Sequence, residues 1–341
     1  MDSVLQLTPK QRGELFIAAA QQSGIDVVVL EKDFWVCWTL KEVFRLPTMG
    51  DHLIFKGGTS LSKVFKIINR FSEDIDVSID RGFLGYGGSN EPEAGTSNKE
   101  KHRRVESLMA ACQQKKIADE LTPALRGSIQ GKISHADNWS LLPDESDPDQ
   151  QTLQFAYPSS LPAGESDYVR RAVKIEMGAR SDHWPYETKS VTPYVAELFP
   201  QGFKQPSCDV KVLAAERTFW EKATILHSEF HRPVEKPTPV RLSRHYCDFY
   251  ELIGKGVAQR AVEQIELLNR VAQHKSLSFK SSWARYGEAA RGSLKFLPPE
   301  YRIAMLQSDY ANMREMFFGK PPNFDGILAL LKEWEREFNR G

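Results

Sequence analysis

Residues 55–80 constrain the fold of this chain more than any other stretch, because a strand, a glycine turn, a helix and a second strand follow one another there. Gly57 and Gly58 come directly after the apolar run 53–55. Polar residues, three of them aspartates, alternate with apolar residues over 74–80, which is typical of a half-buried strand. Between them, one helical face is indicated by the spacing of Leu61, Val64, Phe65 and Ile68. The stretch therefore predicts a sheet with a helix packed against it.

The same stretch predicts a phosphate and metal site. A glycine turn that opens a helix leaves backbone N–H groups free, where an anion is favoured. Asp74 and Asp76 lie two residues apart on the expected strand, so their side chains share a face. Such a pair suits Mg²⁺ or Mn²⁺, since Mg²⁺ prefers one or two carboxylates together with substrate phosphates. Taken separately, the glycines would indicate only a turn and the acids only a solvated edge strand. The order of strand, glycine turn, helix and acidic strand favours a phosphate and metal site instead.

Two charged residues further along the chain extend this site. Glu176 lies on the expected strand 168–177, whose other face is apolar. Alone it reads as a surface acid, but beside an aspartate pair it provides the third carboxylate that two-metal phosphoryl chemistry needs. Lys222 lies at the edge of the buried face of the expected helix 212–230. It is either a lysine with a buried stem and an exposed amine, or a cation that reaches the β- or γ-phosphate.

Composition excludes several classes of protein. The N-terminus has no signal pattern, and no apolar run approaches the roughly 18 residues of a membrane span, so we expect a cytoplasmic protein without membrane contact. Four cysteines without CxxC spacing indicate neither a zinc site nor a disulfide framework. A formal net charge of zero argues against a broadly basic nucleic-acid binder. On charge alone, the basic cluster at 99–116 is better interpreted as a solvated helix face.

The rest of the chain alternates between helical and extended patterns, without an internal repeat or a low-complexity tract. After residue 257 the pattern is mostly helical. We therefore expect strands and helices to mix in the first two thirds and helices to dominate afterwards. The expected elements are helices at 8–46 and 99–126, a loop at 137–151, strands at 151–157 and 168–177, and helices at 212–230 and 243–253.

Five motifs in this order, FKGGTSLSK, SEDID, KIEMGAR, RTFWEKATILH and SRHYCDFYEL, resemble the AbiEii/MenT nucleotidyltransferase toxins of the polymerase-β-like superfamily. The resemblance runs from about residue 31 to the C-terminus, and the combined set is specific. It implies an α+β fold with a small mixed nucleotidyltransferase sheet flanked by helices and a mainly helical C-terminal region. We accordingly divide the chain into a nucleotidyltransferase core, 1–233, with a loop-and-helix insertion at 82–150, and a helical domain, 234–341.

The resemblance also implies an activity. Members are toxins of toxin–antitoxin or abortive-infection (phage-defence) systems, usually encoded beside an antitoxin. Several use Mg²⁺ to transfer a nucleotide from an NTP to the 3′ end of tRNA. The glycine motif here reads Gly-Gly-Thr-Ser, so which hydroxyl contacts phosphate stays open. Carried over by position, the triphosphate contacts are Gly58, Thr59, Ser60 and Lys222, with Gly57 in the same turn; the metal ligands are Asp74 and Asp76; Asp248 is an essential acid; and Glu176 matches the third carboxylate.

The acceptor is the least constrained part of this prediction. The candidate contacts to an RNA backbone are basic, as phosphate contacts usually are. A protein or small-molecule acceptor is the alternative, which the neutral net charge keeps reasonable. A non-catalytic nucleotide-binding interaction protein is a third possibility, but three acids and a lysine kept together argue against it. The RNA candidates are Lys101, Arg103, Arg104 and Arg244.

Overall fold

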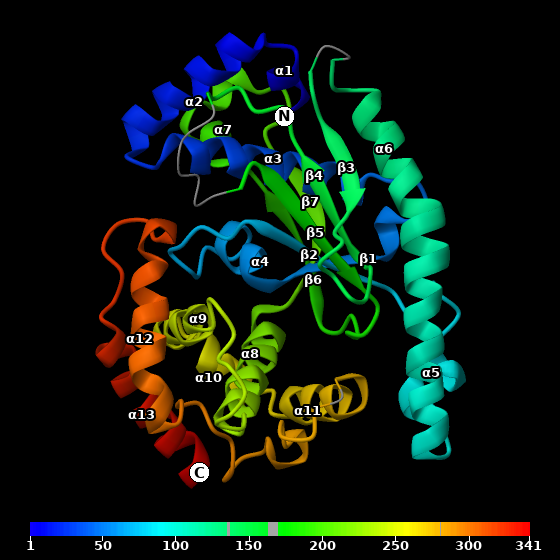
Figure 1. The fold of residues 1–341 in the computed structure, drawn as a ribbon, viewed down its shortest axis with the longest axis vertical. Coiled ribbons are helices and arrows are strands. Elements are labelled where there is room, and N and C mark those ends of the chain that lie inside the picture. The colour runs from blue at the N-terminus through cyan, green and yellow to red at the C-terminus, as the bar shows by residue number, and fades with distance from the viewer. Residues whose placement is uncertain (135–136, 163–169, 280) are drawn as a thin grey trace.

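A seven-stranded mixed sheet organises the fold in the computed structural model, which describes residues 1–134, 137–162, 170–279 and 281–341 (Figure 1). The strand order is β3-β4-β5-β2-β1-β7-β6. The pairs β2–β5 and β1–β7 are parallel and the others antiparallel. The strands are β1 (Leu53–Lys56), β2 (Asp74–Ile79), β3 (Ser140–Pro143), β4 (Thr152–Ala156), β5 (Ala172–Gly178), β6 (Tyr186–Val191) and β7 (Cys208–Leu213).

Helices surround this sheet and continue beyond it. Figure 1 shows α5, a π-helical segment (Ala111–Leu121) and α6 forming one long rod along the sheet, and α8 to α13 gathered at one end. The N-terminal helices are α1 (Asp2–Leu5), α2 (Pro9–Ser23), α3 (Val27–Phe44) and α4 (Gly57–Lys63), followed by α5 (Asn98–Ala110), α6 (Thr122–Gln130) and α7 (Tyr194–Leu198). The C-terminal helices are α8 (Ala215–Phe230), α9 (Ser243–Gly254), α10 (Val257–Val262), α11 (Glu266–Ser278), α12 (Ile303–Asn312) and α13 (Phe324–Arg340).

Helix α3 covers one face of the sheet and leaves the other face for the polar residues. It is buried on all sides, and Trp35 packs against Phe155 of β4 and stacks on Tyr157. Ile75 and Val77 of β2 belong to the same apolar cluster. Because side chains alternate along a strand, Asp74 and Asp76 point away from α3. Among the described residues no single helix is long and apolar enough to cross a membrane. Helices α2 and α3 reach that length and composition only when taken together, and the pair is bent by 115°.

A second apolar cluster holds the C-terminal helices together. Phe219 and Trp220 of α8 pack there with Phe249 of α9 and Trp334 of α13. By its apolar packing, α8 therefore groups with the helices that follow it, and a division based on packing would fall near Ala214. The division of the chain at residue 233 stays a prediction.

The predicted mixture of a strand-and-helix core with a mainly helical C-terminal part is confirmed, while several elements differ. The helix after the glycine turn ends at Lys63 and does not continue to Ile68, because Lys66 adopts a positive φ of 52°. The expected loop at 137–151 contains the short edge strand β3. Strand β6 was not predicted, because it lies at the sheet edge, is mostly exposed and lacks an apolar alternation. Strand β7 was not predicted either, although its burial alternates, and it ends at Leu213, inside the helix expected at 212–230.

Candidate active site

Strand pairing places a lysine and two acids in one row across the sheet. Lys56 of β1 lies opposite Asp76 of β2, and Asp76 lies opposite Glu176 of β5. Thr152 of β4 continues the row beside Glu176. Residues paired in register share a face of the sheet, and all four line one cavity of about 350 Å³. Sequence reasoning missed Lys56; its position directly before Gly57 was the available signal.

Asp74 lies on the same face as Asp76, as the alternation predicted, but it opens into a neighbouring cavity of about 300 Å³. The two cavities adjoin, because Ser146 and Lys174 line both. The Lys174 ammonium lies 2.6 Å from Oε1 of Glu176. Glu176, the predicted third carboxylate, therefore lies beside Asp76 and is paired with Lys174.

The two glycines allow the turn to approach charged groups closely. Gly57 has a φ of +80°, and a Cβ there would lie 1.9 Å from Oδ2 of Asp76. A Cβ on Gly58 would lie 2.8 Å from the Ser72 hydroxyl and 3.2 Å from Nη2 of Arg70. Only glycine tolerates both the backbone conformation at Gly57 and this proximity. The turn, the Asp76 carboxylate and the buried guanidinium of Arg70 are therefore neighbours.

Thr59 and Ser60 are buried behind this turn. The Thr59 hydroxyl donates to the Asp74 carbonyl and lies 2.9 Å from the Ser72 hydroxyl. The Ser60 hydroxyl donates to the Gly57 carbonyl at 2.8 Å. The Thr59 hydroxyl therefore fixes the turn onto β2, and the Ser60 hydroxyl stabilises the turn itself. Contact of either hydroxyl with a triphosphate stays a prediction.

Lys222 and Asp248 meet in a buried ion triad that also contains Arg70. The Lys222 amine lies 2.8 Å from Oδ2 of Asp248. Arg70 binds the same carboxylate in a bidentate manner, at 2.7 and 2.8 Å. Burial alone would raise the pKa of Asp248, but the two cations outweigh it and hold that pKa far below its usual range. Burial lowers the pKa of Lys222, against the opposing effect of Asp248.

The acids on β2 carry more negative charge than their surroundings neutralise. Burial raises the pKa of Asp76 to about 7; Lys56 opposes this shift, while Glu176 and Asp74 add to it. Burial likewise raises the pKa of Asp74, and Glu73 and Glu176 contribute. A divalent cation would offset this repulsion, and the oxygen donors are of the type that Mg²⁺ and Mn²⁺ prefer.

The donor set is incomplete without substrate. In the part of the chain that the structure describes, no three His, Cys, Asp or Glu side chains are grouped closely enough to hold a metal ion. Asp74 and Asp76 therefore fit a metal whose remaining ligands come from phosphates and water, as is common for Mg²⁺. Whether Glu176 is a ligand stays a prediction.

The four candidate RNA contacts lie in two different places. The charge of Arg244, on α9, lowers the pKa of both Asp74 and Asp76 against the larger effect of burial, so it lies near the acids. Arg104 is occupied by Glu100, at 2.7 Å, and by two backbone carbonyls. Lys101 and Arg103 share α5 with Arg104. None of these three α5 residues lines the cavities that contain Asp74 and Asp76.

The mixed sheet presents paired aspartates beside a glycine turn, with a buried lysine on α8, and this arrangement suits nucleotidyl transfer. The chain belongs to the family described as nucleotidyl transferase AbiEii toxin, type IV toxin–antitoxin system, whose sequence pattern matches residues 38–330. This match confirms the resemblance of the five motifs. Membership makes the protein a nucleotidyltransferase toxin and implies an NTP substrate and an antitoxin partner.

Among solved structures, MenT4, a nucleotidyltransferase toxin from Mycobacterium tuberculosis H37Rv, is similar to this chain. The identity is 16%, the TM-score is 0.46, and the match covers 98% of this chain and 97% of that one. A search of curated proteins found no match.

Metal binding to this site is expected to stabilise the protein. Mn²⁺ at about a hundredfold excess over its dissociation constant should add about 2.7 kcal/mol, which raises the melting temperature by several degrees in a protein of this size. The shift should be smaller at pH 6 than at pH 8, because protons compete for an acid whose pKa is about 7. Differential scanning calorimetry checks this. Asp76→Asn should lose the shift and Asp209→Asn, at an exposed acid on β7, should keep it; equal shifts in both variants would contradict the site.

Proposed function

We propose that this protein uses Mg²⁺, or Mn²⁺ in its place, to transfer an NMP from an NTP to the 3′ end of a tRNA in the cytoplasm, and that a cognate antitoxin restrains it in phage defence. The row of Lys56, Asp76 and Glu176 against the Gly57 turn is the observation that supports transfer most strongly. One end of this row, which has the glycine turn and cations, suits the NTP that donates the nucleotide. The other end, which has a carboxylate, suits the RNA hydroxyl that accepts it.

The donor end lies at β1. Gly58 lies close to Arg70, which joins the turn to the Lys222–Asp248 pair. We infer that this set, together with Lys56, holds the triphosphate. Asp74 and Asp76 would hold the metal, which supplies neutralisation of the charge that develops on the α-phosphoryl group. In this proposal Asp248 orients two cations, and Lys222 contacts the phosphates.

The acceptor end lies at β5. The 3′-hydroxyl oxygen forms a bond to the α-phosphorus, and the bond between that phosphorus and the pyrophosphate breaks. Glu176 accepts the hydroxyl proton, directly or through a water, and the Lys174 ammonium 2.6 Å away orients its carboxylate. The pyrophosphate leaves toward the cations at β1. Each charged residue of the row thus has a separate role in one in-line displacement.

A labelling experiment tests the acceptor class. Purified protein is incubated with each α-³²P-NTP and a cell extract, and the products are digested with RNase or protease. We expect label in RNA of tRNA size, removed by RNase only. Label that only protease removes would favour protein nucleotidylation, the alternative that the neutral net charge supports. Toxicity without any label would favour a non-catalytic interaction protein.

A further inference from the structure

A third cavity, of about 680 Å³, lies beside the cavity that contains Asp76 and Glu176. Gln151, Arg180 and Phe279 line both, so the two adjoin. The third cavity lies between α5, the C-terminal end of α8 and the residues that follow α11. Its volume is in the range of small-molecule binding pockets. We name it the lateral pocket, and it is lined by Met109, Gln151, Arg180, Phe279, Trp283 and Tyr286 among others.

Aromatic rings dominate the lateral pocket. Phe279 is exposed, and Trp283 and Tyr286 are half-buried. The guanidinium of Arg180 lies over the Phe279 ring, and the Arg232 guanidinium and the Lys236 ammonium lie over the Trp283 ring. Both arginines are neutralised, however, because Arg180 is paired with Asp149 at 2.7 Å and Arg232 with Glu229 at 2.6 Å. The pocket therefore favours a flat group with polar edges over a phosphate.

The position of the lateral pocket relative to the acids decides which substrate it serves. The row of residues runs from Lys56 on β1, beside the glycine turn, to Glu176 on β5. The pocket joins the catalytic cavity through Gln151, just before β4, and Arg180, just after β5. It thus opens beyond Glu176, at the end opposite the proposed triphosphate site.

We propose that the lateral pocket binds an unpaired nucleobase near the 3′ end of the acceptor RNA and stacks it on Trp283. This inference rests on the proposed function and specifies the acceptor subsite. Stacking on aromatic side chains and arginine planes is the usual way in which proteins hold single-stranded RNA. The base sits beside the terminal nucleotide, whose hydroxyl then lies at Glu176.

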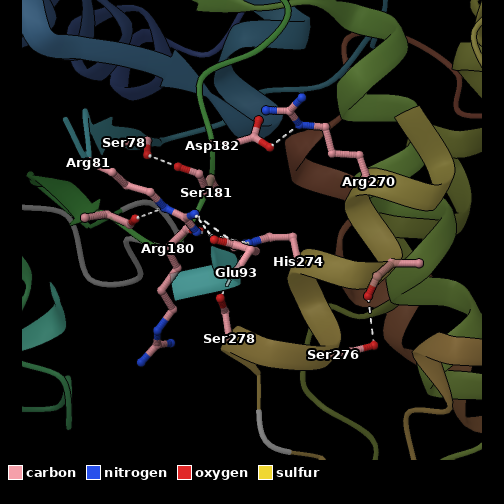
Figure 2. A network of polar contacts seen from close by, with 12 residues as sticks. Ser78, Arg81, Glu93, Arg180, Ser181, Asp182, Arg270, His274, Ser276 and Ser278 are labelled. Carbon is pink, nitrogen blue, oxygen red and sulfur yellow. Dashed lines mark hydrogen bonds and ion pairs between the residues drawn. The ribbon is translucent and has the colours of Figure 1, made fainter. Parts of the chain in front are cut away.

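The walls of the pocket are held in place before any ligand arrives. Figure 2 shows Arg81 at the centre of a polar network that joins three parts of the chain. Arg81 donates to the carbonyls of Ala179 and Arg180, binds Glu93 of the insertion at 2.9 Å, and lies 3.1 Å from Nδ1 of His274 on α11. The end of β5, the insertion and α11 are therefore tied together. A preformed wall reduces the ordering cost of binding.

Fluorescence anisotropy with a short fluorescein-labelled single-stranded RNA tests the pocket without NTP. Trp283→Ala is expected to weaken binding roughly 5- to 150-fold, the range that loss of one stacked base contact gives. Trp283→Phe should restore most of the affinity, because it keeps a ring. Trp184→Ala is the matched control, since Arg270 also lies over the ring of Trp184 but this residue is outside the pocket; its affinity should not change. Melting curves check that each variant is folded.

The kinetics separate acceptor from donor. Trp283→Ala should raise KM for RNA and leave KM for NTP unchanged. A raised KM for NTP alone would make the pocket a donor-base site and overturn the inference, as would unchanged RNA binding. Failure of the proposed function looks different, since wild-type protein would then label no RNA. Wild-type protein that binds no RNA would contradict both.

Discussion

Asp76→Asn is expected to reduce NMP transfer about a thousandfold or more while the protein stays folded. The substitution removes one of two carboxylates that would hold the metal, and with it several kcal/mol of transition-state charge stabilisation. Each 1.36 kcal/mol corresponds to a tenfold change in rate, so about 4 kcal/mol gives this factor. Asparagine has nearly the same shape, which preserves the close approach of Gly57 to this side chain. Single-turnover transfer of α-³²P-NMP measures the loss.

The same variant should become more stable than wild type in metal-free buffer at pH 8. Burial raises the pKa of Asp76 to about 7, so the folded state holds the proton more tightly than the unfolded state. The stability that this proton provides is present at low pH and is lost as pH rises from about 4 to 7. Asparagine cannot ionise and avoids the loss, a gain of about 1–2 kcal/mol after allowance for solvent screening.

Urea denaturation at pH 5 and pH 8 measures this difference. The expected gain at pH 8, with a clearly smaller one at pH 5, separates loss of activity from loss of fold. Asp209→Asn should resemble wild type at both values. Full transfer activity in Asp76→Asn would exclude this carboxylate from the site.

The site residues that the sequence predicted are those whose position depends on local periodicity. Alternation along one strand was enough to place Asp74 and Asp76 on one face, and an alternating pattern elsewhere identified Glu176. Lys56 could not be found in that way. It joins the row only because β1 pairs with β2 in one register, and no pattern within β1 reports that register.

Long-range contacts account for the other omissions. Arg70 lies in an irregular connection, and its carboxylate partner, Asp248, is 178 residues away in the sequence. Lys222 was predicted as a candidate phosphate contact at a helix edge, but its buried pairing with Asp248 was not predicted. Strand β6 lies at the edge of the sheet and pairs only with β7. Its residues are mostly exposed, so they show no pattern of apolar residues that would predict a strand. Neither an ion pair between distant elements nor an exposed edge strand produces a periodic pattern in the sequence.

Asp248→Asn is expected to cost about 3–5 kcal/mol of folding free energy and most of the transfer activity. The change leaves Arg70 and Lys222 buried without a counter-charge, which is the costly case for a buried ion pair. Because the cations hold the pKa of Asp248 below its usual range, its contribution is present above about pH 4 and is lost as pH falls further. Because the folded pKa lies far below 4, urea denaturation should show a large difference between wild type and variant at pH 7 and a somewhat smaller one at pH 3.

Lys222→Met separates the structural role of the triad from its chemical role. Asp248 keeps its bidentate pair with Arg70 in this variant, and methionine replaces most of the lysine stem, so the stability loss should be about 1 kcal/mol or less. Transfer should still be lost, with a raised KM for NTP, if Lys222 holds the phosphates. Normal transfer by Lys222→Met together with an unstable Asp248→Asn would assign the triad to folding alone. Loss of transfer in both, with loss of stability only in Asp248→Asn, would show that Asp248 positions a cation that the reaction uses.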